Sequence, residues 1–275
     1  MKLIEQYIQS KTGNNNDCED EIFFSNDFAA VIDGATSKSA LKYKNRFLGK
    51  VSSIILKHSL KSLDLRSSAE DAISYLTERI YKFYQENNMT EHVIQNPVDR
   101  PSASIVIYSK FRNEIWMVGD CQCMIDNNKY YNKKLIDELL SNVRSLYLQM
   151  EEILGHKVTT NGLDVGREFI KPLLEKQSLF QNSNINSDYT YGVIDGFEVP
   201  KDEIKKIIVP PKVKSIILAS DGYPILCSTL KQSEKKLQDI LDQDPMCYKE
   251  YKTTKGIMEN NVSFDDRAYI RIQRD

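Results

Sequence analysis

Apolar runs that end in an aspartate recur along the chain. Residues Phe28 to Ile32 lead into Asp33-Gly34, and Ile216 to Ala219 lead into Ser220-Asp221-Gly222. A short apolar run bounded by turn-forming residues is typical of a strand buried on both faces. Each aspartate would therefore lie where a buried strand gives way to a loop, and we expect Gly34 to allow a sharp turn.

Short strands and amphipathic helices alternate along the rest of the chain. Strands are predicted at residues 21–24, 28–32, 103–108, 114–118, 121–125, 191–196, 204–209, 213–219 and 267–272. One helix is predicted to begin at residues 35–39, and a second is predicted to begin at a capping box made by Ser67 and Glu70. Further helices are predicted at residues 134–154, 165–180 (interrupted at Pro172), 234–241 and 246–258. Residues 204–209 and 213–219 would form a hairpin. Because hairpins outnumber plausible βαβ units, one α+β domain covering residues 1–275 is expected.

Composition narrows the class of protein. The formal net charge of −2 over 275 residues gives no electrostatic case for binding nucleic acid or an anionic membrane. The first residues lack the apolar core of a signal peptide, and no apolar stretch is long enough to span a membrane. The five cysteines are scattered without zinc-site spacing, so reduced thiols in a cytoplasmic protein are expected.

Missing motifs exclude several kinds of active site. The sequence has no glycine-rich phosphate loop, no dinucleotide-binding fingerprint and no Gly-x-Ser-x-Gly elbow. None of the three histidines stands beside a cysteine or a plausible nucleophilic serine, so a catalytic triad or histidine-rich zinc site is not expected. Carboxylates remain, at Asp17, Glu19, Asp20, Asp33, Asp120, Asp221, Asp265 and Asp266.

For any one of these residues, a role in a turn or a helix cap is the commoner explanation. As a group, these carboxylates suggest a metal site. If the strand ends meet, several carboxylates share one cleft, and some of their pKa values would rise strongly unless a cation lies among them. A cluster of oxygen ligands without histidine suits Mg²⁺ or Mn²⁺. Two such ions can activate a bridging water for phosphoryl transfer.

The order of these motifs resembles that of the metal-dependent (type 2C) protein phosphatases. In chain order the matching motifs are Glu19-Asp20, Phe28 to Gly34, Ser102 to Ile107, Val118 to Asp120, Ile217 to Gly222 and Asp265-Asp266. The resemblance implies two packed antiparallel sheets flanked by helices on both sides, an α-β-β-α sandwich with a binuclear Mn²⁺ or Mg²⁺ centre at one end. It also implies hydrolysis of phosphoserine or phosphothreonine in proteins by a metal-activated water, without a phosphoenzyme.

The resemblance also assigns roles to residues. Asp33 would bridge the two ions, and the carbonyl of Gly34 would ligate one of them. The further ligands that it implies are Asp20, Asp221 and Asp265, with Asp17 and Asp266 as alternatives to Asp20 and Asp265. Glu19 would orient metal-bound water, and Asp120 matches the position linked to a weaker third ion.

The chain departs from the family pattern after its first Asp-Gly. Ala35 stands where the family often has His or Met-Gly-Gly, and alanine cannot donate a proton. No arginine clearly matches the phosphate-binding one of some members, and Lys38 or Lys11 could substitute. Two hypotheses therefore stand: an active phosphatase, or a catalytically weak or inactive phosphatase-fold regulatory or binding protein. A phosphohydrolase with Asp33 as nucleophile would need a second Asp two residues on, where Ala35 stands.

Overall fold

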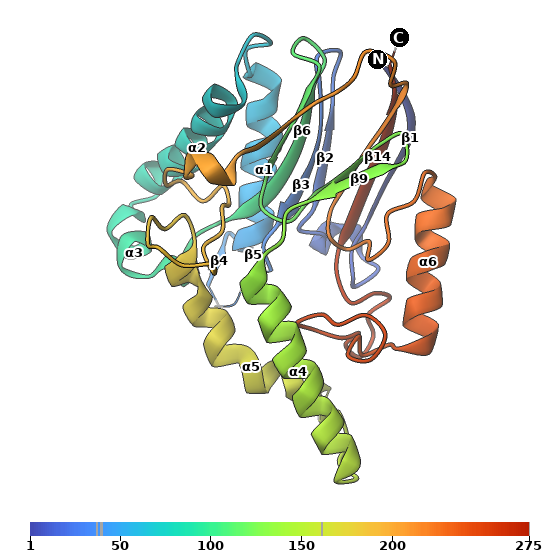
Figure 1. The fold of residues 1–275 in the computed structure, drawn as a ribbon. Coiled ribbons are helices and arrows are strands. Elements are labelled where there is room, and N and C mark those ends of the chain that lie inside the picture. Colours follow the sequence, from blue (N-terminus) through green and yellow to red (C-terminus); the bar gives the residue numbers. More distant parts are fainter. Residues whose placement is uncertain (37, 39–40, 161, 275) are drawn as a thin grey trace.

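Two five-stranded antiparallel sheets pack face to face in the computed structural model, which describes residues 1–36, 38, 41–160 and 162–274 (Figure 1). One sheet has the order β1 (Lys2–Gln9), β14 (Arg267–Gln273), β13 (Ser215–Ala219), β8 (Gln122–Ile125), β9 (Asn128–Tyr131). The other has the order β12 (Lys205–Ile208), β7 (Glu114–Val118), β6 (Ala103–Ser109), β3 (Phe28–Gly34), β2 (Glu21–Phe24). Short hairpins are formed by β4 (Lys42–Tyr43) with β5 (Arg46–Phe47) and by β10 (Thr159–Thr160) with β11 (Leu163–Asp164).

The strand β3 shows why its sequence is apolar without alternation. Successive side chains of a strand point to opposite faces of the sheet. Ala29 and Val31 pack between the two sheets, whereas Ala30 and Ile32 pack against the helices outside. Both faces are covered, so all residues of β3 up to Ile32 are buried. The predicted strand buried on both faces is confirmed.

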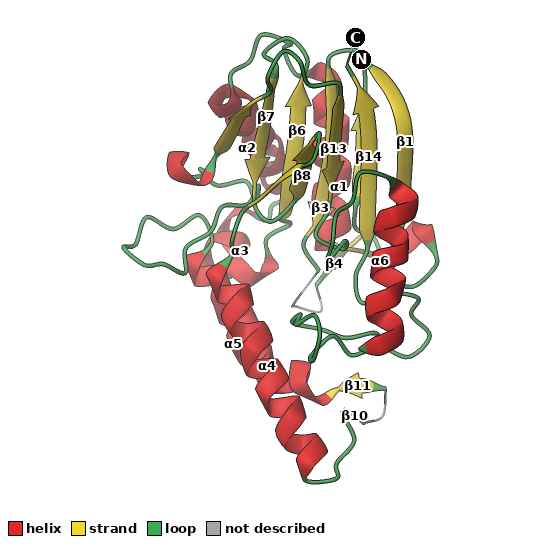
Figure 2. Ribbon diagram, turned by 45° about the vertical axis from the view of Figure 1, so that its right-hand side comes forward, coloured by secondary structure: helices red, strands yellow, loops and turns green. Residues whose placement is uncertain are grey.

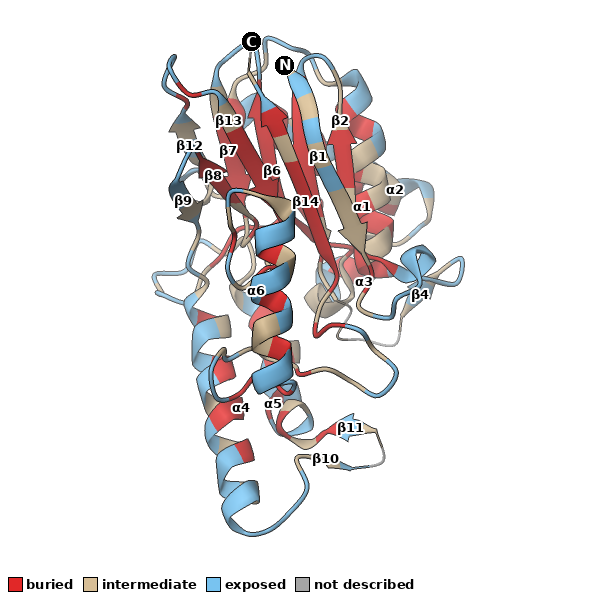
Figure 3. Cartoon of the chain, turned by 90° about the vertical axis from the view of Figure 1, so that its right-hand side faces the viewer, coloured by how far each residue is buried: buried red, intermediate tan, exposed pale blue. Residues whose placement is uncertain are grey.

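Helices cover the outer faces of both sheets. The helices α1 (Leu48–Ser59) and α2 (Ala69–Glu86) pack on the sheet that contains β3, with α3 (Thr90–Gln95) after them. On the opposite side, α6 (Leu230–Gln243) lies over the sheet that contains β14, where Leu230 packs on Ile217 and Tyr269 (Figure 3). The predicted sandwich with helices on both sides is confirmed.

Two helices, α4 (Leu135–Ile153) and α5 (Val165–Lys176), extend from one end of the sandwich (Figure 2). They pack on each other through Leu140, Ile170 and Leu174. The expected interruption at Pro172 is wrong, because α5 continues through it to Lys176 with apolar side chains on both sides of the proline buried. Within the described residues no helix combines the length and apolar character needed to cross a membrane.

Several predicted elements differ from the observed ones. The segments 204–209 and 213–219 do not form a hairpin, since β12 pairs with β7 while β13 pairs with β14 and β8 in the other sheet. The capping box is made by Ser68 and Asp71 rather than one residue earlier. The strand expected at residues 191–196 makes only isolated bridges. A strand that the sequence did not suggest, β1, pairs with the closing strand β14.

Two predicted helices are also corrected. The helix expected from residues 35–39 begins only at Leu48, after the β4–β5 hairpin, and residues 37, 39 and 40 lie outside the described part of the chain. Residues 246–258 are not helical. There the carboxylate of Asp244 accepts hydrogen bonds from the backbone N–H groups of Tyr248, Lys249 and Glu250, which turns the chain back on itself instead.

Candidate metal centre

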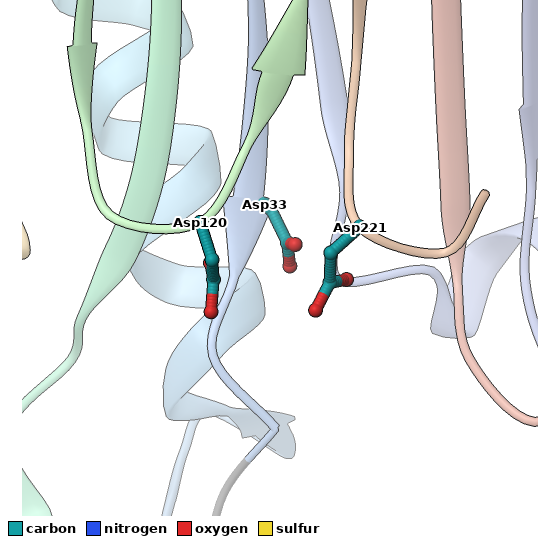
Figure 4. Close-up of side chains that lie close together, drawn as sticks. All are labelled: Asp33, Asp120 and Asp221. Carbon is teal, nitrogen blue, oxygen red and sulfur yellow. The ribbon is translucent and has the colours of Figure 1, made fainter. Parts of the chain in front are cut away.

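Three aspartates meet at one end of the sandwich, and we call them the aspartate triad: Asp33, Asp120 and Asp221 (Figure 4). Asp33 belongs to β3, Asp120 follows β7, and Asp221 follows β13 of the facing sheet. One carboxylate oxygen from each lies within 4.8 Å of the others. Oxygens that bind one ion at about 2.0–2.4 Å are at most about 4.8 Å apart, so the triad could hold a metal ion.

The turn between β7 and β8 places Asp120. Gly119 has a φ of +81°, and a Cβ atom there would lie 2.2 Å from the Oγ of Ser104. Ser104 stands opposite Asp33 in the β3–β6 ladder. Its hydroxyl donates a hydrogen bond of 2.5 Å to the Oδ1 of Asp120 and accepts one of 3.3 Å from the backbone N–H of Asp120. Ser104 therefore fixes Asp120 beside Asp33.

A buried carboxylate borders the triad. Asp20 is 1% exposed, and its Oδ2 has no hydrogen-bond partner among the described residues. Burial and the charge of Asp266 raise the pKa of Asp20 well above its usual value, and the charge of Asp20 in turn helps to raise the pKa of Asp33. A buried oxygen without a partner is costly. A hard cation would satisfy it, so the donor set fits Mg²⁺ or Mn²⁺.

The electrostatics of the triad also fit a cation. Burial, together with the charges of neighbouring carboxylates, raises the pKa values of Asp33 and Asp221 well above the usual value. Like charges that share a cleft repel each other unless a positive charge lies between them. A divalent ion would reverse this repulsion and keep the carboxylates ionised.

A second group of acids at the same end already has counter-ions, and we call Glu19, Asp265 and Asp266 the lysine-bound carboxylates. The Nζ of Lys255 lies 2.6 Å from Asp265, and the Nζ of Lys11 lies 3.2 Å from Glu19 and 3.5 Å from Asp266. Burial acts to raise the pKa of Asp265, but Lys255 and Lys11 lower it below the usual value. This group therefore carries its own positive charge.

The structure places the remaining predicted residues as follows. Asp17 is exposed, accepts hydrogen bonds from Asn14 and Thr12, and is not among the residues that line the cavity at the triad. The carboxylate of Asp266 accepts hydrogen bonds of 2.7 and 2.8 Å from the backbone N–H groups of Lys11 and Glu19, whereas Asp265 lines the cavity at the triad. Of the two pairs of alternatives, Asp20 and Asp265 thus lie nearer to the triad.

Gly34 is a glycine for a different reason from the one expected. Its φ is not positive, so it makes no left-handed turn. A Cβ atom on Gly34 would lie 2.3 Å from the carbonyl oxygen of Gly49 in α1 and 2.6 Å from that of Glu19. The glycine therefore allows α1 and the Glu19 segment to approach the end of β3 closely. The Oε1 of Glu19 is buried there without a hydrogen-bond partner among the described residues.

A cavity of about 110 Å³ opens beside the triad, and its lining contains both carboxylates and basic side chains. Its lining includes Ala35, Lys38, Lys134, Arg167 and Lys255. Burial and the charge of Lys134 lower the pKa of Lys38 to about 7. Sequence reasoning missed three basic residues of the lining. Lys134 directly precedes α4, Arg167 lies in α5 and Lys255 follows α6, so only the fold brings them to the cavity.

The two packed sheets with their helices are the fold of the type 2C protein phosphatases, as the sequence resemblance predicted. The serine/threonine phosphatase Stp1 of Staphylococcus aureus has the same architecture over 100% of this chain and 96% of its own, with a TM-score of 0.50 and 15% identity. At this identity the likeness shows the fold alone. No protein-family model matches the sequence, and no curated protein sequence does.

Two further solved structures have a similar extent of overlap. The serine/threonine phosphatase PstP/Ppp of Mycobacterium tuberculosis overlaps 98% of this chain and 97% of its own, at a TM-score of 0.48 and 13% identity. RsbX in complex with magnesium overlaps 99% of this chain and 98% of its own, at a TM-score of 0.47 and 12% identity.

Proposed function

We propose that this protein is a cytoplasmic Mn²⁺- or Mg²⁺-dependent phosphatase that hydrolyses phosphoserine or phosphothreonine in proteins. The observation that carries the proposal is the meeting of Asp33, Asp120 and Asp221 beside a cavity, in a chain with the type 2C phosphatase fold. The carboxylates come from strand ends far apart in the sequence, and turn or cap roles do not explain why all three converge.

Different residues at the site would bind the metal, orient water and attract the phosphoryl group. The triad, with Asp20 beside it, would hold the metal, and a bound divalent ion supplies an activated water and offsets phosphoryl charge. The Gly34 carbonyl remains a proposed further ligand, and Glu19 a residue that orients water. Asp265, which the resemblance also implies as a ligand, is paired with Lys255 at 2.6 Å. Lys38 and Arg167 line the cavity and make no ion pair within the described part of the chain, although Arg167 donates a hydrogen bond to the carbonyl of Thr254. Their positive charges would attract the anionic phosphoryl group.

The test is phosphate release from a panel of phosphoserine and phosphothreonine peptides, with Mn²⁺ and with chelator. We expect turnover only with the metal, and loss of turnover in Asp33→Asn and Asp221→Asn. Turnover that persists in chelator, or that both variants retain, would exclude the proposed chemistry.

A second candidate function, a phosphatase-fold binding or regulatory protein, is favoured by two observations. Ala35 leaves the cavity without a proton donor at that position, and Asp265 is already bound by Lys255. Mn²⁺ binding measured by calorimetry, with no turnover on a broad phosphopeptide panel, would support this candidate over the first. Brisk turnover would exclude it.

A further inference from the structure

Lys255 lies where a second cation would be needed. Its Nζ is 2.6 Å from the Oδ1 of Asp265 and 3.0 Å from the Oγ1 of Thr36. Lys11 approaches the same two side chains, with its Nζ 3.7 Å from Asp265 and 3.2 Å from Thr36. Two ammonium groups therefore converge on one carboxylate that faces the cavity of the aspartate triad.

The loop that carries Lys255 is held in place by a buried ion pair. Arg144 of α4 is fully buried and donates two hydrogen bonds, of 2.6 and 3.0 Å, to Asp164. Arg144 also donates to the carbonyls of Met246, Cys247 and Thr253. These contacts fix the chain on the N-terminal side of Lys255.

The residue after Lys255 is anchored as well. The backbone N–H of Gly256 donates to Asp164 at 3.1 Å, and Arg167 donates to the carbonyl of Thr254 at 3.0 Å. A lysine whose loop is tied down on both sides loses little further freedom when its ammonium group binds a carboxylate. Its position beside Asp265 is thus built into the fold.

The two groups of acids differ in the number of positively charged side chains that lie near them. The three lysine-bound carboxylates, Glu19, Asp265 and Asp266, have two ammonium groups within 4 Å. In the aspartate triad, Asp33 and Asp221 make no ion pair among the described residues, and Asp120 has only Lys134 at 3.7 Å. A divalent ion at the triad relieves repulsion, whereas one at Asp265 would have to displace or repel an ammonium group.

We propose that Lys255, supported by Lys11, takes the place of a second divalent cation, so that the centre binds one divalent ion, at the aspartate triad. This rests on the proposed function only in requiring that a divalent ion binds to the triad. Asp265 then acts as the partner of Lys255 rather than as a metal ligand.

The experiment is calorimetric titration of the full chain with MnCl₂, which counts ions without requiring activity. We expect one Mn²⁺ per chain for the wild type and two for Lys255→Met, because Asp265 then loses its nearer ammonium group and keeps only Lys11, 3.7 Å away. Lys255→Arg keeps the positive charge and should still bind one. Lys252→Met is the matched control, since Lys252 lies in the same loop but is exposed and its Nζ donates a hydrogen bond to Asn142, and it should also bind one.

The outcomes are separable. Two ions bound by the wild type, or one ion still bound by a folded Lys255→Met, would overturn the role of Lys255 while leaving a metal-dependent phosphatase possible. No Mn²⁺ bound by any variant would overturn the proposed function together with it. Circular dichroism in chelator establishes that Lys255→Met is folded. If it is not, Lys255→Gln, which keeps a hydrogen-bond donor for Asp265, is titrated in its place with the same expectation of two ions.

Discussion

The aspartate triad and the lysine-bound carboxylates are two sets of three acids at the same end of one sandwich, yet they are neutralised in different ways. The triad has raised pKa values at Asp33 and Asp221 because burial and neighbouring carboxylates act together. In the second set the pKa of Asp265 is lowered, because Lys255 and Lys11 outweigh its burial. One set needs a cation from solution, and the other has its cations in the chain.

The difference follows from which elements supply each set. The triad comes from the ends of β3, β7 and β13, where buried strands leave little room for long basic side chains. The second set lies where two loops meet, one carrying Lys11 and the other Lys255. Loops can carry long basic side chains to a site, as the loops of Lys11 and Lys255 do here, whereas the strand ends contribute short aspartate side chains at its edge. On the proposed assignment, six acids at one end of the sandwich bind one metal ion, because two ammonium groups neutralise three of them.

The largest expected effect comes from neutralising the triad. Asp33→Asn and Asp221→Asn each keep the shape of the side chain but remove the charge that holds the ion. We expect phosphopeptide turnover with Mn²⁺ to fall by more than about 100-fold, beyond the tenfold to 100-fold typical of residues that only support ligands. The measurement is the initial rate of phosphate release at saturating Mn²⁺.

Asp27→Asn is the control for that comparison, because Asp27 is an exposed aspartate in the turn between β2 and β3. Its turnover should match the wild type. A fall of similar size in Asp27→Asn, or near-normal turnover in Asp33→Asn, would show that the triad is not the metal centre.

The next effect is on stability and concerns the support of the lysine-bound carboxylates. Arg144→Met removes a buried charge and leaves Asp164 without its partner, together with three backbone carbonyls. Breaking a buried ion pair in this way costs about 3–5 kcal/mol. We expect the free energy of unfolding, measured with urea, to fall by that amount.

Lys171→Met provides the comparison for this loss. Lys171 lies on the same helical extension and pairs with Glu168 at 3.9 Å, but about half of each side chain is exposed. Exposed pairs contribute at most about 1 kcal/mol. Equal destabilisation by Arg144→Met and Lys171→Met would contradict the view that Arg144 anchors the Lys255 loop.

The sequence predicted the triad more fully than it predicted the second set. Asp33, Asp120 and Asp221 each follow a strongly apolar strand, and that local signal survives in the fold. Asp265, which precedes the closing strand, was predicted as a ligand from the family resemblance. No local pattern reveals that Lys255 reaches it, because the contact depends on Arg144, more than 100 residues away from the loop that it holds.

The same distinction applies to the fold. The buried strands and the single domain were predicted from apolar runs and local patterns. The sandwich was predicted from the order of the motifs. The wrong hairpin at residues 204–219 arose because Pro210-Pro211 is turn-forming whether it joins two strands of one sheet or connects two sheets. The strand β1 was missed because its residues alternate between exposed and partly buried and lack a strong apolar run.

A smaller effect is expected in the pH dependence of the basic side of the cavity. Burial and the charge of Lys134 lower the pKa of Lys38 to about 7, so Lys38 is charged below that pH and neutral above it. If it attracts the phosphoryl group, its contribution should decline as pH rises through about 7. We expect the ratio of kcat/KM between the wild type and Lys38→Met to fall from about tenfold near pH 6 to about one near pH 8.

The ratio isolates Lys38 from other groups that titrate in both proteins. A ratio that is constant with pH would contradict the role of Lys38 in attracting the phosphoryl group.

The pH dependence of the free energy of unfolding gives an independent check on the lowered pKa of Lys38. The unfolded chain binds a proton at Lys38 up to about pH 10.4, whereas the folded chain releases it above about 7, so the wild type should gain stability relative to Lys38→Met as pH rises across this range.

The smallest effect tests Lys134, the lysine that pairs with Asp120 of the triad. Lys134 has its Nζ 3.7 Å from Asp120 and 2.7 Å from Asp137, so Asp137 already offsets most of its charge. Removing it with Lys134→Met should therefore tighten Mn²⁺ binding only about threefold, without changing the number of ions bound. Lys133→Met is the control, because Lys133 is its exposed neighbour, and its Kd should match the wild type. A second ion in Lys134→Met would place the internal cation at Lys134 rather than at Lys255, and the contrast between the two sets of acids would then fail.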